Sequence, residues 1–551
     1  MRIWRHTNPV LRGLPALAAC GLLSQGAAAA GLDLRLNEIQ VLGTHNSYHV
    51  QPIPELIDIY VGFDPDVILW EYTHRPLEEQ LEFLGIRQLE LDVWVDPDGG
   101  LLAEPLGLEA LTGMVVHLPE LDPPGMKVQH VADLDWESTC PLLVECLEIL
   151  KAWSDAHPAH LPILVLIEAK DDPPPPIEVI PFVDPLPFGP AEFDDLDAEI
   201  LSVFPPEQLL TPDDVRGARA SLDEAIRKDG WPTLRESRGQ VLFALDNGGQ
   251  KLADYVAGHP ALAGRVMFTD SPPGSPEAAF VKLNDPITNR KLIPKLVRQG
   301  YVVRTRADAD TIQARNGNTN QRFFALQGGA QWVSTDYPEL GPFGTDYIVE
   351  LPGGGPARCN PVSAPKKCRD EGLENLTGLR ALAGRSLSLR DREGDPSRRR
   401  IAVRSKDALV ETPLPGSADD PSLAGATLEV QNPATLESAL FVIPAGAAWE
   451  GRGEPAGSDG WIYRDPAGAN GPCTLLEIRN ASGLRALCSG AAVDFSLDEP
   501  SQGELFVTLR LGAADLHCLR FGGKIVRDVG ITTSRNAAFI ARASPPAGCP
   551  V

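Results

Sequence analysis

Short apolar runs alternate with amphipathic segments from about residue 37 to residue 340. Several runs are apolar at every position, which is typical of parallel strands buried on both faces. The candidate strands are Ile39–Gly43, Ile86–Trp94, Val128–His130, Ile163–Ala169, Val241–Leu245, Val266–Thr269, Tyr301–Thr305 and Trp332–Ser334. The segments Cys140–His157 and Pro205–Arg227 fit between strands as crossover helices. About eight such units predict an α/β fold, a (β/α)8 or TIM-like barrel, over residues 31–345.

The pattern changes after Gly341. A Gly/Pro-rich stretch and a pair of cysteines predict a linker over residues 346–384. From residue 385 to 551, short runs alternate between apolar and polar positions, with turn residues between them. The clearest runs are Ser386–Leu389, Ile401–Arg404, Thr427–Val430, Ala439–Ile443 and Leu505–Leu511. They predict an all-β accessory domain, most simply a sandwich.

The amino terminus has the features of a targeting segment. Three arginines precede the apolar stretch Leu14–Leu23, and four alanines end at Ala30. This order predicts a signal peptide over residues 1–30 and a secreted protein. The sequence Leu17-Ala18-Ala19-Cys20 is also a possible lipoprotein box, which leaves open an anchor through Cys20. The apolar stretch is too short for a retained membrane span, and no later segment has that character.

Eight cysteines remain once Cys20 is set aside, and an even number in an exported chain favours disulfides. Eight cysteines allow 105 connectivities, so the sequence alone does not fix the pairing. The expected arrangement is pairing of neighbours: Cys140 with Cys146, Cys359 with Cys368, Cys473 with Cys488, and Cys518 with Cys549.

The formal net charge is −26. So acidic a chain is a poor binder of nucleic acid, and an anionic membrane would repel it unless a cation bridged the two. We therefore expect no nucleic-acid partner, and we expect a monomer.

Polar residues lie in or directly after the candidate strands, where the active site of such a barrel is found. They include His45 and Asn46, Glu90 and Asp92, His130, Glu168 and Lys170, and Arg306. Strand alternation places Glu90 and Asp92 on one face, and Lys170 on the face of Glu168.

These residue types suit cleavage of a phosphodiester. Two histidines can act as general base and general acid, because imidazole titrates near neutral pH. Asn46, Glu90, Asp92 and Glu168 offer the hard oxygen ligands that Ca2+ prefers. A bound Ca2+ would stabilise developing negative charge, and Lys170 could hold a phosphate oxygen.

The segments Gly43–Tyr48 and Gly85–Trp94 resemble the X-box of the phosphoinositide-specific phospholipases C. Val128–Val131 and Leu166–Lys170 continue the resemblance, which is to the bacterial calcium-dependent group. It covers roughly residues 35–340, including Arg304–Asp308 and Ser334–Pro338, and it does not extend to the carboxyl-terminal domain.

The resemblance implies that Asn46, Glu90, Asp92 and Glu168 bind Ca2+, with His45 and His130 as base and acid. It also implies a phospholipid substrate at a membrane surface, in which the inositol 2-hydroxyl attacks its own 1-phosphate. The basic residues that could read further ring phosphates are few: Lys170, Arg304 and Arg306. This favours phosphatidylinositol over its polyphosphorylated forms.

Several alternatives remain open at the level of single residues. His117 is the rival of His130, and His74 is expected to be structural. Asp336 is expected to cap a strand end rather than contact metal or substrate. Glu90 and Asp92 could instead form a buried ion pair with Arg87. The apolar insertion at residues 50–75 is either a lid or a membrane-contacting segment.

Two other functions remain open for the whole chain. A glycerophosphodiester phosphodiesterase or a sphingomyelinase D-like enzyme also combines a barrel, two histidines and a Glu-x-Asp pair. Asn46 stands where the glycerophosphodiesterases carry an Arg-Gly pair. A non-catalytic surface-binding protein is the alternative of another class, and the full set of carboxylates and histidines argues against it.

Overall fold

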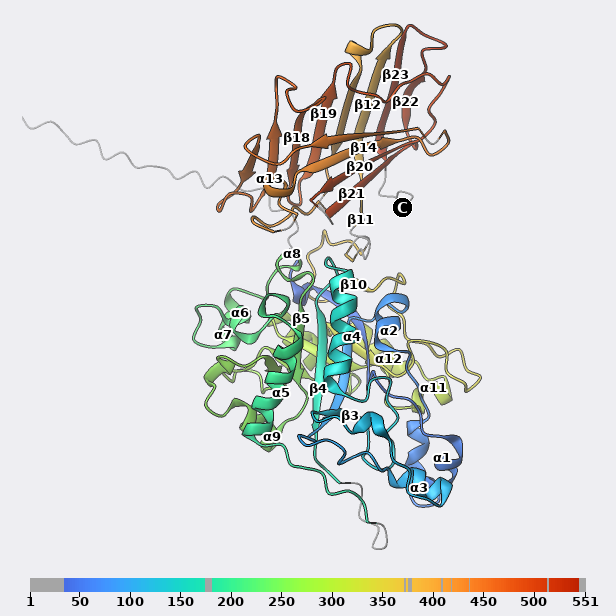
Figure 1. Ribbon diagram of the computed structural model, residues 1–551, viewed down its shortest axis with the longest axis vertical. Coiled ribbons are helices and arrows are strands. Elements are labelled where there is room, and N and C mark those ends of the chain that lie inside the picture. The colour runs from blue at the N-terminus through green and yellow to red at the C-terminus, as the bar shows by residue number, and fades with distance from the viewer. Residues whose placement is uncertain are drawn as a thin grey trace, which may run out of the picture. The chain divides into compact units, whose positions relative to one another are not determined.

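The computed structural model describes residues 34–173, 181–370, 373–374, 379–407, 410–417, 419–435, 437–512 and 515–544. Eight parallel strands form a barrel with helices around it (Figure 1). The strands are β1 (Ile39–Thr44), β2 (Gln88–Trp94), β4 (Ile163–Lys170), β5 (Val241–Leu245), β6 (Met267–Thr269), β7 (Phe280–Lys282), β8 (Val302–Arg306) and β9 (Trp332–Thr335). Their order in the sheet is β6-β5-β4-β2-β1-β9-β8-β7. A parallel bridge between Asp270 and Phe280 brings the two outer strands together, so the predicted (β/α)8 barrel is confirmed.

One predicted strand differs from the structure, and one barrel strand was not predicted. Val128–His130 is not a barrel strand: β3 (Lys127–Val128) pairs antiparallel with β2, with Val128 opposite Val93. The missing barrel strand is β7, which pairs with β8 through Phe280 and Val302. Strand β7 contains only two large apolar residues, Phe280 and Val281, whereas the equally short β6 lies in the apolar run Val266–Phe268, which the sequence did indicate.

The helices that cover the barrel are mostly short. They are α2 (Leu77–Phe83), α4 (Leu143–Ala156), α5 (Pro190–Val203), α6 (Pro212–Arg216), α7 (Leu222–Lys228), α8 (Leu234–Ser237), α9 (Gly249–Val256), α10 (Leu292–Arg298), α11 (Ile312–Asn316) and α12 (Asn320–Gly328). Helix α4 confirms the crossover helix predicted at Cys140–His157, and it buries Leu143, Leu147 and Leu150 at helical spacing.

The single helix predicted over Pro205–Arg227 is wrong. Thr211 caps α6 by accepting a hydrogen bond from the backbone N–H of Asp214, and Pro212 occupies the first helical position. Gly217, at φ +52°, ends α6 after five residues, and α7 then begins at Leu222. Start and stop residues therefore override the apolar period in this segment.

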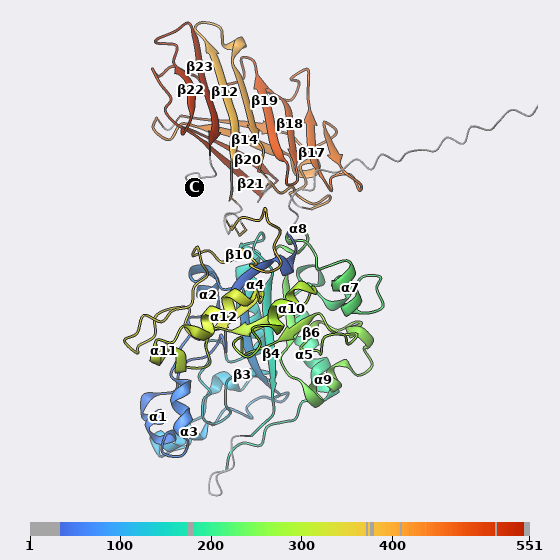
Figure 2. The same ribbon diagram turned by 180° about the vertical axis from the view of Figure 1, so that it is seen from behind.

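The insertion after β1 contains α1 (Pro54–Tyr60) and a 3-10 helix, Pro65–Trp70. Figures 1 and 2 both show α1 beside α3 (Leu106–Thr112). These segments share a small core of their own, formed by Leu56, Ile57, Tyr60, Val67 and Trp136. Because the insertion leaves the carboxyl end of β1, it lies on the side of the barrel where the polar strand ends are found.

The carboxyl-terminal part is an all-β unit of two sheets, as predicted (Figure 2). The five-stranded sheet has the order β11 (Leu379–Leu382), β21 (Asp515–Phe521), β20 (Leu505–Leu511), β14 (Ala426–Gln431) and β15 (Ser438–Ile443). The eight-stranded sheet has the order β16 (Trp449–Arg452), β17 (Gly460–Arg464), β18 (Cys473–Arg479), β19 (Gly483–Ser489), β13 (Arg400–Ser405), β12 (Gly384–Arg392), β23 (Asn536–Ser544) and β22 (Ile525–Val529). Leu428 from one sheet and Val403 from the other belong to one buried core, as in a sandwich.

Three of the expected disulfides are present: Cys140–Cys146, Cys359–Cys368 and Cys473–Cys488. The fourth expected pair, Cys518–Cys549, lies outside the described residues because Cys549 is not among them. The predicted signal peptide and Cys20 also lie outside them. Among the described residues, no helix combines the length and the apolar character that a membrane crossing requires.

The segment after β9 remains part of the barrel. Strand β10 (Ala357–Cys359) pairs antiparallel with β1, with Cys359 opposite Ile39. The buried Arg358 donates hydrogen bonds to the Gln40 side chain at 2.8 Å and to the Leu326 carbonyl at 2.6 Å. Residues of the expected linker thus support the strand that leads into His45.

Candidate active site

The carboxyl ends of the barrel strands bring the expected polar residues together. The loop after β1 carries His45 and Asn46, and it is tied to β2 through Ser47, whose backbone N–H donates to the Glu90 carbonyl at 2.9 Å. The Ser47 hydroxyl in turn accepts a hydrogen bond from the Glu90 backbone N–H at 2.8 Å. Asn46 has φ +44°, in the left-handed region that asparagine tolerates better than most residues. This local bend turns the two side chains over the barrel mouth.

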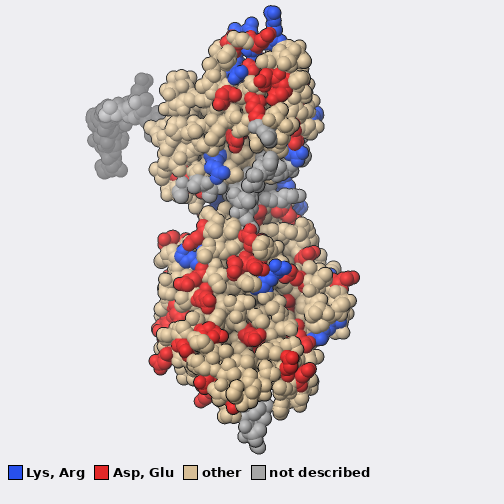
Figure 3. Space-filling view, turned by 45° about the vertical axis from the view of Figure 1, so that its right-hand side comes forward, with Lys and Arg blue, Asp and Glu red and all other residues tan. Residues whose placement is uncertain are grey.

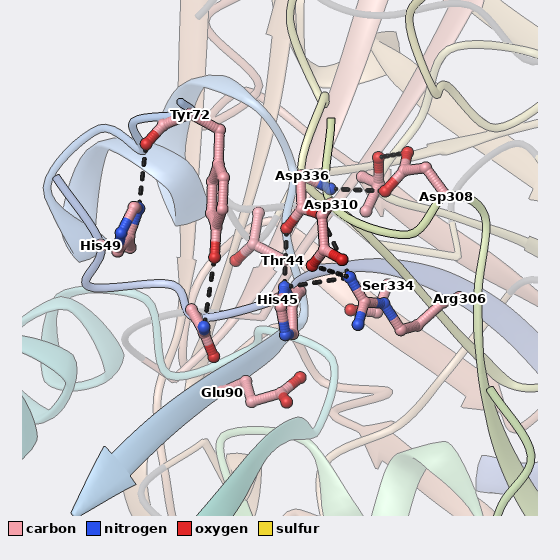
Figure 4. Close-up of polar contacts among 12 residues, drawn as sticks. Thr44, His45, His49, Tyr72, Glu90, Arg306, Asp308, Asp310, Ser334 and Asp336 are labelled. Atoms are coloured by element: carbon pink, nitrogen blue, oxygen red, sulfur yellow. Dashed lines mark hydrogen bonds and ion pairs between the residues drawn. The ribbon is translucent and has the colours of Figure 1, made fainter. Parts of the chain in front are cut away.

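His45 is paired with a buried carboxylate. Its Nδ1 lies 2.8 Å from Asp336 Oδ1, and only 12% of the His45 side chain is exposed. Arg306 Nη2 lies 3.2 Å from the other oxygen of Asp336 and also contacts Asp310 at 3.3 Å (Figure 4). A hydrogen on Nδ1 that donates to Asp336 leaves Nε2 of His45 as a proton acceptor.

The surroundings of His45 keep its ring neutral. Burial, followed by the positive charges of Arg306 and Arg304, holds the pKa of His45 well below its usual value. The His74 Nε2–H donates to the His45 carbonyl at 2.8 Å and fixes the backbone there. Burial also lowers the pKa of His74, to about 4, so His74 is a neutral structural residue, as expected.

His130 has a carboxylate partner of its own. Its Nδ1 donates to Asp135 Oδ2 at 2.7 Å, and His49 Nε2 donates to the same oxygen at 2.9 Å. Because His49 Nδ1 also donates to the Tyr72 carbonyl, both nitrogens of His49 act as donors. Burial alone would lower the pKa of His49, but Asp135 outweighs it and raises the pKa. The described part of the chain offers no hydrogen bond to Nε2 of either His45 or His130.

The four expected metal ligands include buried oxygens without hydrogen bonds. Both carboxylate oxygens of Asp92 and the Oδ1 of Asn46 have none, although each of these atoms is buried. Asp92 stands directly opposite Glu168 in the parallel pairing of β2 with β4. Orphaned buried oxygens are costly unless something binds them, so this donor set fits a hard cation such as Ca2+.

Two cationic side chains neutralise part of the carboxylate set. Lys170 Nζ lies 3.5 Å from Asp92 and 3.6 Å from Glu168, and Arg304 is paired with Glu90. Burial nevertheless raises the pKa of Glu90 to about 7, and burial with the neighbouring acids Glu168 and Glu90 raises that of Asp92. The negative charge of these carboxylates thus exceeds the positive charge of Lys170 and Arg304. This imbalance favours binding of a cation.

Three residues considered as alternatives in the sequence have other contacts in the structure. His117 is half exposed and contacts Asp122 at 2.9 Å and Glu104 at 3.4 Å. Arg87 pairs with Glu374 at 2.7 Å rather than with Glu90 or Asp92. Asp336, expected to be a strand-end cap, instead contacts the side chains of His45 and Arg306, because the turn after β9 directs it back across β1 and β8.

Four residues that organise the site were not expected from the sequence: His49, Tyr72, Asp135 and Asp308. Asp308 accepts from the Asp336 backbone N–H at 2.9 Å and so positions the partner of His45. Asn46 Nδ2 donates to the Tyr72 hydroxyl at 3.1 Å, which leaves its oxygen free for a ligand. Asp135 lies only five residues after His130, so the sequence could have indicated it as a partner of that histidine. The role of Tyr72 depends on the fold of the insertion and has no such local signal.

A barrel that gathers two histidine–aspartate pairs beside hard oxygen ligands has the arrangement of a phosphodiester-cleaving enzyme. Residues 34–361, more than half of the chain, match the family described as "Phosphoinositide phospholipase C, Ca2+-dependent". The chain therefore belongs to this family and is an enzyme of the phospholipase C type. A search of curated proteins found no significant match.

Solved structures with a similar chain include calcium-dependent enzymes. One is a calcium-dependent phosphoinositol-specific phospholipase C from a Pseudomonas species, at 17% identity over 60% of this chain and 96% of that chain, with a TM-score of 0.36. The calcium-dependent phosphatidylinositol-specific phospholipase C from Streptomyces antibioticus is 19% identical over 55% and 95%, with a TM-score of 0.35. The phosphatidylinositol-specific phospholipase C from Listeria monocytogenes is 16% identical over 56% and 92%, with a TM-score of 0.30.

Proposed function

We propose that the protein cleaves phosphatidylinositol by general acid–base catalysis, with His45 as base and His130 as acid. One observation carries this assignment. Each of the two histidines is held at Nδ1 by its own buried aspartate, and Nε2 of each is left without a partner in the described part of the chain. A pair of oriented imidazoles is what an in-line displacement at phosphorus needs, one to accept a proton and one to give it.

His45 suits the role of base. Its lowered pKa keeps it neutral at physiological pH, so Nε2 can take the proton of the inositol 2-hydroxyl. As the ring becomes positive, the carboxylate of Asp336 at 2.8 Å stabilises it. The same contact selects the tautomer that leaves Nε2 free.

His130 suits the role of acid. Asp135 accepts its Nδ1–H at 2.7 Å and so orients the ring for release of a proton from Nε2 to the leaving glycerol oxygen. Asp135 also has His49 as a permanent donor, and His49 and His130 together outweigh burial and lower the pKa of this carboxyl. Asp135 therefore stays ionised and holds both rings in place.

Asn46, Glu90, Asp92 and Glu168 would hold a calcium ion. Ca2+ bound there supplies positive charge opposite the developing phosphorane and makes the attacking hydroxyl more acidic. Lys170 contacts two of these carboxylates, so its Nζ lies where it can also reach a phosphate oxygen. Arg306, beside His45, is the second candidate for a substrate contact.

Few cations at the barrel mouth are free to read additional phosphates on the inositol ring. Arg304 is paired with Glu90, Arg306 with Asp336, and Lys282 with Asp246. Lys170 is shared between Asp92 and Glu168. This supports phosphatidylinositol, rather than its polyphosphorylated forms, as the substrate.

The rim of the site carries exposed apolar side chains suited to a lipid surface. Phe63, in the insertion after β1, is 66% exposed, and Met114 and Val115, which follow α3, are 68% and 60% exposed. Exposed large apolar side chains grouped on one rim are typical of a membrane contact. They support a substrate that is presented in a bilayer.

The decisive experiment measures water-soluble inositol phosphate released from phosphatidylinositol vesicles, with Ca2+ and with chelator. We expect calcium-dependent release by the wild type, loss of release in His45→Ala, and no change in His117→Ala, which alters an exposed histidine. Release that survives the chelator would contradict the metal assignment. Equal activity of His45→Ala and wild type would contradict the base assignment, and absence of release under every condition would exclude this headgroup.

We further propose that the protein is exported, either free or lipidated at Cys20. Three disulfides support an oxidising compartment. Cell fractionation and mass spectrometry of the mature amino terminus test this. A terminus at Gly31 indicates secretion, a lipidated Cys20 indicates an anchor, and an uncleaved cytosolic chain would refute export.

A further inference from the structure

The eight-stranded sheet of the carboxyl-terminal unit contains a basic pocket. Its volume is about 460 Å³, and it lies where the start of β12, the end of β13 and the turn between β18 and β19 meet. The basic side chains that line it are Arg385, Arg404, Lys406, Arg479 and Arg485. Glu477 is the one acidic residue of the lining.

The close approach of the β18–β19 turn to β13 shapes this pocket. Gly483 begins β19 with φ +135°, and a Cβ at that position would lie 2.4 Å from the Ser405 carbonyl oxygen. Only glycine allows the turn to lie so close to the end of β13. The pocket is thus a consequence of the fold rather than of loosely arranged surface arginines.

Positive charge in the pocket is only partly balanced. Arg485 contacts Glu477 at 2.6 Å, but Glu477 is also bound by Arg452 at 2.9 Å, and Arg479 is paired with Asp459 at 3.0 Å. Arg385, Arg404 and Lys406 have no ion pair with any residue in the described part of the chain.

Two arginines of the lining face each other across the sheet. Arg404 stands directly opposite Arg485 in the pairing of β13 with β19. Like charges at directly opposed positions destabilise a sheet, and a bound anion would relieve the repulsion. Arg390 and Arg400 are opposed in the same way outside the pocket, so this opposition points to a ligand only together with the shape of the pocket and its unbalanced cations.

The pocket is an exception in an acidic protein. Residues 1–384 contain 31 Lys and Arg against 55 Asp and Glu, while residues 385–551 contain 18 against 20. On the face drawn in Figure 3, acidic side chains are scattered over the barrel with few basic ones among them. An anionic bilayer repels such a barrel, so the basic pocket provides an attraction that the catalytic part lacks.

The geometry points to a binding site for the phosphate-bearing headgroup of an anionic phospholipid, formed by Arg385, Arg404, Lys406 and Arg485. Guanidinium groups bind phosphate through two parallel hydrogen bonds, and a pocket of this size accommodates a glycerophosphate headgroup. The choice of a lipid as the source of the phosphate rests on the proposed function, because the substrate would be presented in a bilayer. Binding at this site involves neither the barrel histidines nor Ca2+.

The test is co-sedimentation of the full chain with phosphatidylcholine vesicles, with and without phosphatidylglycerol, in the presence of chelator. The variant Arg404→Gln/Lys406→Gln removes two cations that have no ion pair. The matched control is Arg390→Gln/Arg400→Gln, a second pair of exposed arginines directly opposite each other on β12 and β13 but outside the pocket. We expect the pocket variant to lose about 30-fold in affinity for anionic vesicles, at about 1 kcal/mol per basic residue. The control variant should lose less than about threefold.

Inorganic phosphate, compared with chloride at equal ionic strength, should compete with the vesicles for the wild type. Equal losses in the two variants would overturn the proposal, because they would indicate diffuse attraction by the whole face. Binding of phosphate without binding of anionic vesicles would overturn the lipid as ligand. Because the assay uses no phosphatidylinositol and no turnover, failure of the proposed function would leave its outcome unaffected. In a separate turnover assay, wild type and pocket variant should cleave a soluble substrate equally, because the pocket lies outside the catalytic machinery.

Discussion

Replacement of Asp336 by asparagine tests how the protein orients and stabilises the base. Asp336→Asn keeps the shape of the side chain and removes its charge. The wild-type carboxylate is buried, accepts from His45 Nδ1 at 2.8 Å and contacts Arg306 at 3.2 Å. In the variant, a neutral amide faces the histidine when its ring becomes positive, and the amide can also present its NH2 group and favour the wrong tautomer.

The size of the effect follows from the geometry. A hydrogen bond to a charged group contributes about 1.5–3 kcal/mol, which corresponds to a loss of roughly 10- to 150-fold in rate. Coulomb attraction over 2.8 Å at an effective dielectric constant of about 20 gives an upper figure of roughly 6 kcal/mol, or about 10⁴-fold. Part of it is offset because Arg306 already shares the carboxylate. We therefore expect kcat to fall by at least about tenfold.

The assay is steady-state release of inositol phosphate, with thermal unfolding measured in parallel to confirm that the variant folds. Asp310→Asn is the matched control, since it removes the same charge from a residue that contacts Arg306 but makes no hydrogen bond to His45. Asp336 does not stabilise the base in this way if Asp336→Asn retains kcat within about threefold of wild type, or if Asp310→Asn loses as much.

Four further predictions follow from the site and its rim. Arg306→Gln removes a positive charge that lowers the pKa of His45, so this pKa rises and the acidic limb of the kcat/KM profile moves to higher pH; an unmoved limb contradicts the base assignment. Because burial raises the pKa of Asp92, protons compete with Ca2+, and calorimetry should show calcium affinity falling as the pH is lowered. Asp92→Asn should abolish the calcium-induced gain in stability, which is about 2.7 kcal/mol at 100 times the Kd in the wild type; a persisting gain places the ion elsewhere. Phe63→Ser should reduce hydrolysis of vesicles about tenfold and spare a soluble substrate, whereas Phe83→Ser, equally exposed at the opposite end of the barrel, should change neither.

The barrel was predictable because long strands such as β4 are recognisable as continuous apolar runs, and helices such as α4 by their apolar residues at helical spacing. The segment Val128–His130 follows an apolar pattern too, but it is not a barrel strand. Strands β1 and β4 already pair with β2 on its two sides, so this segment pairs with β2 only as the short antiparallel strand β3. Strand β7 was missed for the opposite reason. Phe280–Lys282 has only two large apolar residues, too few to indicate a strand, and pairing with β8 rather than local preference makes this segment a strand.

The residue types of the candidate site were predictable from the sequence, but the contacts between these residues were not. Glu90 and Asp92 share a face because strands alternate, and that relation is local. The contact of His45 with Asp336 joins positions 291 residues apart and depends on β1 and β9 being neighbours in the barrel. Asp135 likewise gains its importance only when His49, 86 residues away, is brought to the same oxygen.

The antiparallel pairing of β10 with β1 affects how the protein can be divided. Tyr347, Val349, Leu351 and Leu373 belong to the same core as the barrel strands, and Arg358 bonds to Gln40 inside it. A truncation at residue 345 would expose that core and leave the strand that leads into His45 without one of its neighbours. An exchange of the carboxyl-terminal unit for another domain should therefore keep the chain through Leu373, so that the transplanted part begins after the barrel has closed on itself.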